Sequence, residues 1–245
     1  MFIRRLLIAP NRQLVKHFSA NIASPEQVKN ATANVTKTDN NIDVHAKPTI
    51  PPPPPASFSH QGDNGTTTCL SGDILPKDHR VFKAIGATEE LLSYIGLTRE
   101  HAIDAEHDYI HKLMRIQTVL IDVSTAISRC NGKIDKEKTT IPALHTKELE
   151  EWINEYSKQL PPVELYIIPG GGIASASLHV ARSLCRRTER TVVPLVRDNM
   201  LDKEVQVYLN RLADFLLTLS RIASKLDNRA ESIYTPKGNE QFQAQ

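Results

Sequence analysis

The stretch "SLHVARSLCRRTERTVVPLV", residues 177–196, has the residue spacing of an α-helix with one apolar side. An α-helix turns about 100° per residue, so residues three or four positions apart share a side. Small or apolar residues lie on one side of this helix along the whole stretch: Leu178, Ala181, Leu184, Cys185, Thr188 and Val192. The stretch therefore predicts an amphipathic helix that packs against a protein core.

The same stretch concentrates positive charge on another part of its surface. Arg182, Arg186 and Arg190 follow one another down one side, and His179 and Glu189 fall within the same arc. Guanidinium groups stacked in this way repel one another unless an anionic group lies along them. Carboxylates of the protein could supply it, and so could a polyphosphate, whose oxygens match the planar guanidinium fork. The spacing alone leaves both interpretations open.

Four other stretches have comparable helical periodicity, and they are joined by short loops. Asp78 is the expected N-cap of the first helix, and "QLPP" ends the third because proline cannot continue a helix. No strand pair is evident. The sequence predicts an all-α fold, a five-helix bundle with ferritin-like up-and-down packing. The expected helices cover residues 78–97, 103–130, 145–159, 177–196 and 201–228.

Composition supports a helical domain and excludes several other classes. The 245 residues are 40% hydrophobic but only 5% aromatic, which suits a bundle built from Leu, Ile, Val and Ala. A formal charge of +2 is too small for a general nucleic-acid binder. No apolar run reaches the roughly 18–20 residues of a membrane span. The three cysteines have no metal-ligand spacing, so we expect reduced thiols and no structural zinc.

The N-terminal segment, "MFIRRLLIAPNRQLVKHFSANIAS", is basic and amphipathic. It contains Arg4, Arg5, Arg12 and Lys16, and the first acidic residue is Glu26. This is the composition of a mitochondrial transit peptide, assigned here to residues 1–25. The alternative is a disordered basic tail.

The next segment, residues 26–57, is rich in Asn, Thr, Ala and Pro and ends in "KPTIPPPPPAS". It contains too little apolar surface to fold, which predicts a disordered proline-rich linker. The folded domain is expected to span residues 58–235, followed by a disordered tail at 236–245.

Two further motifs carry polar groups suited to a ligand. In "GDNGTTT", residues 62–68, the glycines let the backbone approach an anion, although the G-K-[ST] ending of a P-loop is absent. In the last helix, Asn210 and Asp214 lie one turn apart in a Leu-rich pattern. They could pair with arginines of residues 177–196. Alternatively, Asn210 could hydrogen-bond a nucleotide while Asp214 orients an arginine.

Taken in order, these motifs resemble the PduO-type ATP:cob(I)alamin adenosyltransferases, whose mitochondrial members are corrinoid adenosyltransferases. The similarity covers roughly residues 59–235 and is most specific in "CRRTER" and "NRLADFL". It implies a homotrimer with active sites between neighbouring subunits. It also implies transfer of the 5′-deoxyadenosyl group of ATP to the cobalt of reduced cobalamin, with release of triphosphate and with Mg²⁺ accompanying the nucleotide. Mitochondrial members act in the matrix and supply adenosylcobalamin to methylmalonyl-CoA mutase.

The resemblance also implies roles for individual residues. Arg186, Arg190 and Glu189 match catalytic positions, and Tyr166 stands where members usually have Phe in the apolar wall that excludes the lower axial ligand of cobalt. Glu89 and Arg182 match an acidic–basic pair that bridges subunits. The remaining matches are expected to bind ATP: Ser59, His60, Gln61, Gly62, Thr67, Thr68, Lys77, Arg187, Thr188 and Asn210.

The N-terminal phosphate loop departs from the family pattern. Ser59 and Gln61 replace two threonines, and Asn64 stands where Lys is common. The leading hypothesis is an active mitochondrial adenosyltransferase. The altered loop motivates an alternative, a catalytically weak cobalamin-binding escort of the same fold. A third interpretation is a structural bundle whose arginines pair only with carboxylates.

Overall fold

The computed structural model describes a helical unit that begins after the proline-rich segment. It separates residues Met1–Pro55 from residues Ala56–Gln245. The expected transit peptide (1–25), linker (26–57) and tail (236–245) lie outside the described residues. Those described are 62–130, 132, 134–135, 137–162 and 166–234.

Five helices form the described part of the chain, as predicted: α2 (Arg80–Asp104), α3 (Ile110–Ser128), α4 (Leu144–Ser157), α5 (Ile173–Arg197) and α6 (Lys203–Leu226). The expectation of no strand pairs is wrong. Two short antiparallel pairs are present, formed by β1 (Thr66–Thr68) with β2 (Ile74–Pro76) and by β3 (Ile167–Ile168) with β4 (Ser232–Ile233). Strands of two or three residues are too short to produce a readable alternation of polar and apolar residues.

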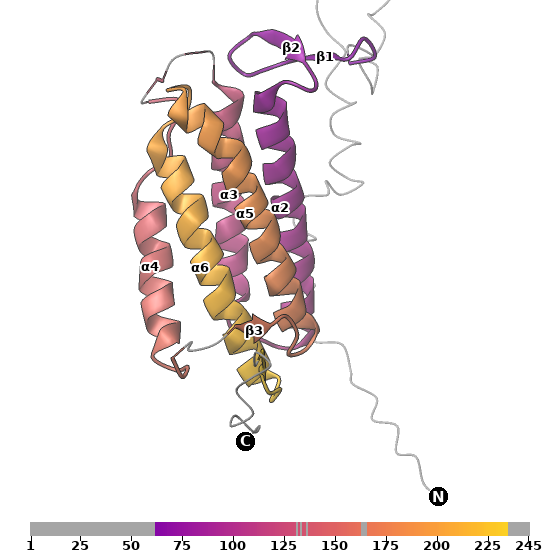
Figure 1. Cartoon of the computed structure of the whole chain (residues 1–245), viewed down its shortest axis with the longest axis vertical. Coiled ribbons are helices and arrows are strands. Elements are labelled where there is room, and N and C mark those ends of the chain that lie inside the picture. The colour runs from indigo at the N-terminus through magenta and orange to yellow at the C-terminus, as the bar shows by residue number, and fades with distance from the viewer. Residues whose placement is uncertain (1–61, 131, 133, 136, 163–165, 235–245) are drawn as a thin grey trace, which may run out of the picture. The chain divides into compact units, whose positions relative to one another are not determined.

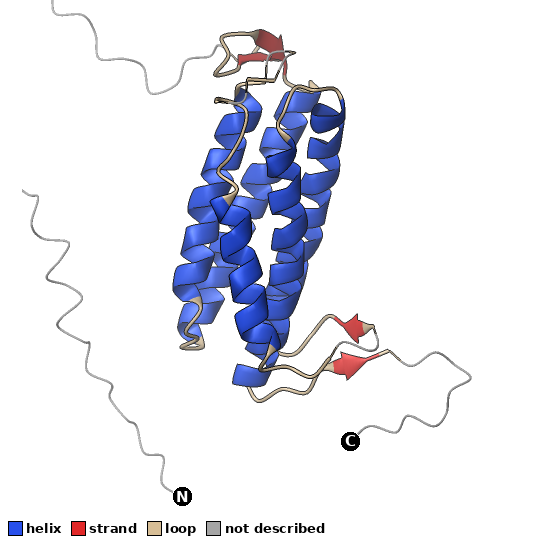
Figure 2. Ribbon diagram, turned by 90° about the vertical axis from the view of Figure 1, so that its left-hand side faces the viewer, coloured by secondary structure: helices blue, strands red, loops and turns tan. Residues whose placement is uncertain are grey.

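The helices lie side by side in one bundle (Figure 1). Helix α5 packs against both α2 and α6, while α3 packs against α2 and α4 packs against α6. The two strand pairs lie at opposite ends of the bundle (Figure 2). The β1–β2 hairpin is at the end where α2 begins and α5 ends, and the β3–β4 pair is at the end where α5 begins and α6 ends.

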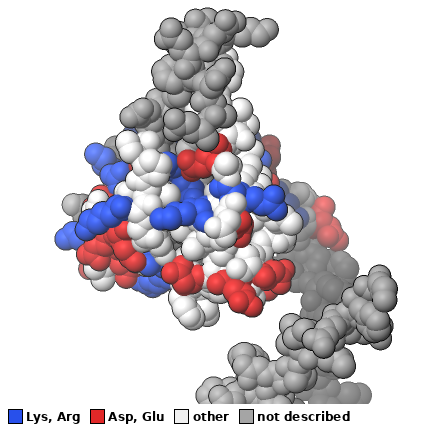
Figure 3. Space-filling model, turned by 90° about the horizontal axis from the view of Figure 1, so that it is seen from below, with Lys and Arg blue, Asp and Glu red and all other residues white. Residues whose placement is uncertain are grey.

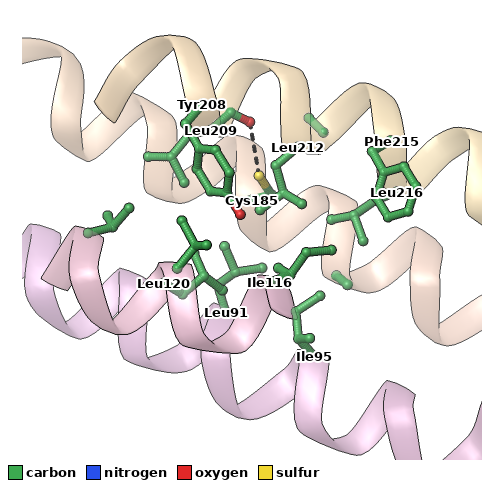
Figure 4. Close-up of a cluster of buried hydrophobic side chains, with 14 of the residues drawn as sticks. Leu91, Ile95, Ile116, Leu120, Cys185, Tyr208, Leu209, Leu212, Phe215 and Leu216 are labelled. Atoms are coloured by element: carbon green, nitrogen blue, oxygen red, sulfur yellow. Dashed lines mark hydrogen bonds between the residues drawn. The ribbon is translucent and has the colours of Figure 1, made fainter. Parts of the chain in front are cut away.

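The core lies between α2, α3, α5 and α6 (Figure 4). On α5 the buried positions recur with spacings of three and four residues, as an apolar side requires: Leu178, Ala181, Cys185, Thr188, Val192 and Leu195. Five of the six predicted apolar positions are buried, and the sixth, Leu184, is partly buried. The Cys185 thiol donates a hydrogen bond of 3.1 Å to the Leu209 carbonyl of α6. Each fully buried Leu side chain in this core contributes roughly 1.5–3 kcal/mol to folding.

Helix α2 differs from its predicted bounds at both ends. It begins after His79, whose Nδ1 accepts a hydrogen bond from the Val81 N–H, so Asp78 is not the N-cap. It continues past Leu97 to Asp104 because Thr98 is fully buried and donates its hydroxyl to the Tyr94 carbonyl. Thr98 has a polar side chain, yet it occupies a core position.

Helix α3 consequently begins at Ile110 rather than near residue 103. Glu106 adopts a left-handed conformation (φ 56°), and the His107 N–H donates to the Ala102 carbonyl over 2.9 Å. This hydrogen bond closes the end of α2 and turns the chain. Asn199 and Asn228 adopt the same conformation after α5 and α6.

The three cysteines are free thiols. Cys69, Cys130 and Cys185 are buried, and none of them forms a disulfide. Burial raises the pKa of Cys130 to about 12, so its thiol stays protonated. Within the described residues, none of the helices combines the length and hydropathy that a bilayer crossing requires.

Candidate functional site

Three arginines of α5 form the centre of the candidate site; we call Arg182, Arg186 and Arg190 the arginine stripe. Arg186 and Arg190 are exposed, and Arg182 is half-buried. Among the described residues, none of the three has a carboxylate or hydrogen-bond partner. The Nε of Arg182 is buried without any partner. Within the described part of one chain, carboxylates therefore do not neutralise the stripe.

Arg187 and Thr188 belong to the same motif but face the bundle differently. Arg187 lies about 100° around the helix from Arg186 and forms an ion pair with Glu90 of α2. Thr188 is fully buried, and its hydroxyl donates to the carbonyls of Ala87 (2.9 Å) and Leu184 (3.0 Å). The side chain of Thr188 thus holds α5 against α2, which removes it from the expected ATP ligands.

Glu189 is attached to α6 beside the stripe. Its Oε1 accepts a hydrogen bond of 3.0 Å from the side-chain amide of Asn210. This contact fixes one carboxylate and one amide next to the arginines. Asn210 therefore contacts the carboxylate of the motif rather than one of its arginines.

Asp214 also differs from expectation. Its carboxylate accepts from Arg211 of its own helix over 3.0 Å, and Arg211 in turn donates to Glu150 of α4 over 3.1 Å. Asp214 therefore links α6 to α4 through Arg211 and does not orient an arginine of α5.

The glycine-rich motif forms a turn that leads into the β1–β2 hairpin. A Cβ atom on Gly62 would lie 2.7 Å from Lys77 Nζ, so the absence of a side chain lets the ammonium group lie against the backbone. The Lys77 N–H donates to the Gly65 carbonyl over 2.9 Å, and Gly65 has a φ of 75°. Lys77 has no carboxylate partner among residues whose contacts are described. The turn thus combines a free ammonium group with closely approachable backbone.

The other expected members of this loop are only partly described. Thr67 is half-buried and Thr68 is exposed on β1. Ser59, His60 and Gln61 lie outside the described residues.

The glycine turn lies at the end of the bundle where α5 ends, and the stripe lies along the middle of α5. An ion pair between Arg80 and Asp198 joins the start of α2 to the end of α5, next to the hairpin. Arg190 lies about two turns before the end of α5, and the stripe extends about 12 Å from there toward the opposite end. Positive charge therefore extends from the region of the hairpin along the α5 surface.

Tyr166 lies at the opposite end of the bundle, directly before β3. It is 72% exposed, and its carbonyl accepts a hydrogen bond of 2.9 Å from the Tyr234 N–H. Ile168, Ile173 and Ile233 are also exposed in this region. Tyr166, the residue expected to contact the lower face of the corrin, thus belongs to an exposed apolar surface at the start of α5.

A buried polar cluster that no sequence motif indicates lies near this surface. The Tyr109 hydroxyl contacts His107 Nδ1 at 2.7 Å, and His107 Nε2 contacts Asp227 at 3.0 Å. Burial, reinforced by the Asp227 charge, raises the pKa of the Tyr109 phenol. Asp227 also borders Gly172, where a Cβ would lie 2.6 Å from its carboxylate. The cluster joins residues 120 positions apart, so no local pattern could have revealed it.

Glu89 and Arg182, the expected subunit contact, do not pair with each other within this chain. Glu89 is exposed on α2, and neither residue has an ion-pair partner in the described ranges. Both charges are available to a second molecule.

The geometry defines a class of protein: a helical bundle with unpaired positive charge along one helix and a glycine turn with a free ammonium at one end. Both groups have the chemistry that suits phosphate oxygens. The described residues contain no group of three or more His, Cys, Asp or Glu side chains placed to hold a metal ion.

The chain belongs to the cobalamin adenosyltransferase family, whose sequence profile matches residues 57–223. It is 40% identical over 183 residues to human corrinoid adenosyltransferase MMAB, covering 74% of this chain and 73% of the human protein. It is 32% identical over 165 residues to a corrinoid adenosyltransferase of Citrobacter freundii, covering 67% of this chain and 93% of the bacterial protein.

Solved structures of the same family share the fold. A variant of the PduO-type ATP:corrinoid adenosyltransferase from Lactobacillus reuteri, complexed with cobalamin and ATP, matches with a TM-score of 0.67 and 30% identity. The match covers 72% of this chain and 98% of that chain. A second variant of the Lactobacillus reuteri enzyme, complexed with ATP, matches with a TM-score of 0.65 and 30% identity, over 73% and 99% of the two chains.

Proposed function

We propose that this protein transfers the 5′-deoxyadenosyl group of ATP to the cobalt of reduced cobalamin. Family membership supports the reaction, and related structures are complexed with cobalamin and ATP. The observation that carries the proposal is the arginine stripe, whose guanidinium groups have no carboxylate partner in the described part of the chain. A structural bundle would have satisfied these charges internally.

The reaction requires positioning and charge stabilisation more than acid–base catalysis. Cob(I)alamin is a strong nucleophile, so its electron pair forms the cobalt–carbon bond without help from a base. The bond between C5′ and the phosphate oxygen breaks, and its electron pair leaves with the triphosphate. The protein must hold C5′ in line with cobalt and stabilise the departing anion.

Arg186 and Arg190 are the groups suited to the departing triphosphate. Both are exposed on one side of a rigid helix, one turn apart. Lys77 and the backbone at Gly62 would bind phosphate oxygens at the hairpin end. Asn210 donates to Glu189 beside the arginines, which keeps this carboxylate in a fixed position near the nucleotide.

Magnesium is proposed as a companion of the nucleotide rather than a resident metal. Mg²⁺ is usually bound by substrate phosphates with one or two carboxylates, and Glu189 is a carboxylate held beside the stripe. This donor set fits a nucleotide-borne ion, and no larger metal cluster exists among the described side chains. When bound, Mg²⁺ would neutralise part of the triphosphate charge.

Tyr166 is proposed to contact the corrin at the end of the bundle where α5 begins. Its ring is exposed at the start of α5, where it could supply the apolar surface that keeps the lower axial ligand away from cobalt. The phenolic hydroxyl requires a hydrogen-bond partner or water in that position.

Assembly as a homotrimer is proposed from the resemblance and from two unpaired charges. Arg182 has a buried Nε without a partner, and Glu89 is exposed without one. An ion pair between Arg182 of one chain and Glu89 of its neighbour would satisfy both and bring the nucleotide surface next to a subunit boundary.

Location in the mitochondrial matrix is proposed from the basic, acid-free N-terminal 25 residues. A matrix enzyme of this family would supply adenosylcobalamin to methylmalonyl-CoA mutase.

A single-turnover assay tests the function. Chemically reduced cobalamin and ATP are mixed with the protein, and adenosylcobalamin is measured by its absorbance spectrum. We expect stoichiometric product and release of triphosphate. Absence of product with retained cobalamin binding would indicate the escort function instead. Absence of both product and ATP-dependent thermal stabilisation would indicate a structural bundle.

A further inference from the structure

A buried ion pair holds the end of α6 to the segment that follows it. Arg221 donates from Nε to one carboxylate oxygen of Glu231 over 2.8 Å and from Nη2 to the other over 3.2 Å. The side chain of Arg221 is only 7% exposed, and that of Glu231 is 22% exposed. Bidentate pairs of this kind fix both distance and orientation. Removing one partner would leave a charge in a largely dry position, so the pair is hard to open.

Glu231 directly precedes the strand that supports Tyr166. Strand β4 begins at Ser232 and pairs with β3 in the register Ile167 with Ile233 and Ile168 with Ser232. The Tyr234 N–H then donates to the Tyr166 carbonyl. Three consecutive links therefore lead from the buried Arg221 to the backbone of Tyr166.

The strand pair has little else to hold it in place. Each strand has two residues, and isolated two-stranded ribbons are marginally stable in water. Most of its side chains are exposed, including Tyr166, Ile168, Ile233 and Tyr234. The position of Tyr166 therefore depends on where β4 is anchored.

Neighbouring contacts make the anchor rigid. The Ser224 hydroxyl donates to the Arg229 carbonyl over 3.0 Å, and Lys225 Nζ donates to the Gln159 carbonyl over 2.9 Å. A pocket of about 400 Å³ lies next to the ion pair and is lined by Leu160, Pro161, Arg221, Lys225, Asn228 and Glu231, among others. Viewed from this end, Lys and Arg side chains form a band across the face that reaches its left edge, and Asp and Glu lie mainly below this band (Figure 3).

We propose that Arg221 and Glu231 form a positioning clamp for Tyr166. By fixing β4, the ion pair fixes β3 and the tyrosine that precedes it, so that the ring is held against the lower face of the corrin. Neither residue needs to touch the substrate. The role in catalysis rests on the proposed function, whereas the control of strand position does not.

The test compares Glu231→Gln with Glu148→Gln in the full chain. Glu148 is a matched control because it accepts two hydrogen bonds from Arg115, links α3 to α4 and has a side chain 29% exposed. Hydrogen exchange of the Tyr234 and Ile168 amides is measured by mass spectrometry. We expect exchange in Glu231→Gln to rise on the order of tenfold, and no change at these amides in Glu148→Gln. Unchanged exchange in Glu231→Gln would overturn the clamp.

A second readout addresses the substrate. With cobalamin varied, Glu231→Gln should raise the KM for cobalamin several-fold while the KM for ATP stays unchanged. Electron paramagnetic resonance gives a further measurement, made on protein loaded with ATP and cob(II)alamin. In Glu231→Gln, a smaller fraction of the bound cob(II)alamin should lack its lower axial ligand. Faster strand exchange with an unchanged KM and spectrum would overturn the positioning role.

A third variant and the wild type distinguish a failure of the clamp from a failure to fold and from a failure of the proposed function. If Glu231→Gln does not fold, Arg221→Lys keeps the charge but loses the fork, and it should show the same changes to a smaller degree. If wild-type protein forms no adenosylcobalamin, the proposed function fails, while the exchange comparison still decides whether the clamp exists.

Discussion

At the scale of single residues, two sets of three arginines among the described residues differ in their partners. Arg115, Arg211 and Arg221 each have a carboxylate partner on another segment. The three arginines of the stripe have none among the described residues. Adjacent like charges raise the free energy of the folded chain unless a ligand or partner neutralises them. Unpaired guanidinium groups placed one above another therefore support the proposal that the stripe binds an anionic ligand.

Replacing Arg186 by Ala should remove activity without unfolding the protein. The side chain is exposed and unpaired, so folding loses little, while the leaving triphosphate loses a charged donor. Removal of one such donor typically costs 10²–10³ in rate, and we expect a loss of at least about a hundredfold. Single-turnover rates and melting temperatures are the measurements.

Arg187→Ala is the matched control for this variant. It neighbours Arg186 in sequence but pairs with Glu90 on the other flank of α5. Its activity should stay within a few-fold of wild type. Wild-type turnover by Arg186→Ala would show that the stripe does not bind the triphosphate.

His179 should make stability depend on pH. Burial, with the nearby Arg182 charge, lowers the pKa of His179 below its ordinary value of 6.5, although Glu231 acts in the opposite direction. The unfolded chain therefore binds a proton at a higher pH than the folded chain. The stabilisation is complete above about pH 6.5, decreases as the pH falls below that value and levels off below the folded-state pKa.

Melting temperatures between pH 8 and pH 5 test this expectation. His179→Gln should lose part of the wild-type decrease at low pH, whereas His111→Gln, at an exposed position on α3, should retain it. Parallel curves for wild type and His179→Gln would contradict the assignment.

At the scale of elements, the start of α5 depends on glycine. Gly172 precedes the helix with φ 101° and ψ 167°, a region used almost only by glycine. A Cβ there would also meet the Asp227 carboxylate at 2.6 Å. Gly172→Ala should therefore lower the free energy of unfolding by about 1–3 kcal/mol or more.

Gly86→Ala provides the comparison. Gly86 lies within α2, is exposed and has no atoms within 4 Å of an added Cβ. Alanine should stabilise the helix there by about 0.5–1 kcal/mol. Urea denaturation measures both variants, and equal effects would show that the turn before α5 tolerates a side chain.

The five helices were predictable because long helices repeat their apolar positions many times. The end of α2 was not, since Thr98 is polar by type but satisfies its hydroxyl within the helix and occupies a core position. The strand pairs were missed because their stability comes from partners distant in the chain. Ile167 pairs with Ile233, 66 residues away, and no local pattern records that contact.

The candidate site was predictable to a similar degree. The stripe followed from residues four positions apart on one helix. Thr188 was included because motif matching follows sequence order, whereas the direction of a side chain follows its angle around the helix. The clamp between Arg221 and Glu231 was missed because the turn after Asn228 reverses the chain in a way that composition does not reveal.

At the scale of the whole molecule, one chain leaves part of its charge unsatisfied. The Nε of Arg182 is buried without a partner, which is costly for a charged group, and Glu89 of α2 has no ion pair in the described ranges. Glu90, the next residue, already pairs with Arg187. A second copy of the chain could neutralise both remaining charges at once.

Glu89→Lys should therefore prevent assembly, because it places two positive charges across the proposed subunit boundary. Light scattering after size-exclusion chromatography should find monomers of this variant and, as proposed above, trimers of wild type. Glu90→Lys breaks only the pair within the chain and should still form trimers. Combining Glu89→Lys with Arg182→Glu reverses both charges and should restore assembly at least in part. A stable trimer of Glu89→Lys would show that this contact does not hold the subunits together, and the orphaned Arg182 would then need another anionic partner, with the nucleotide as the first to test.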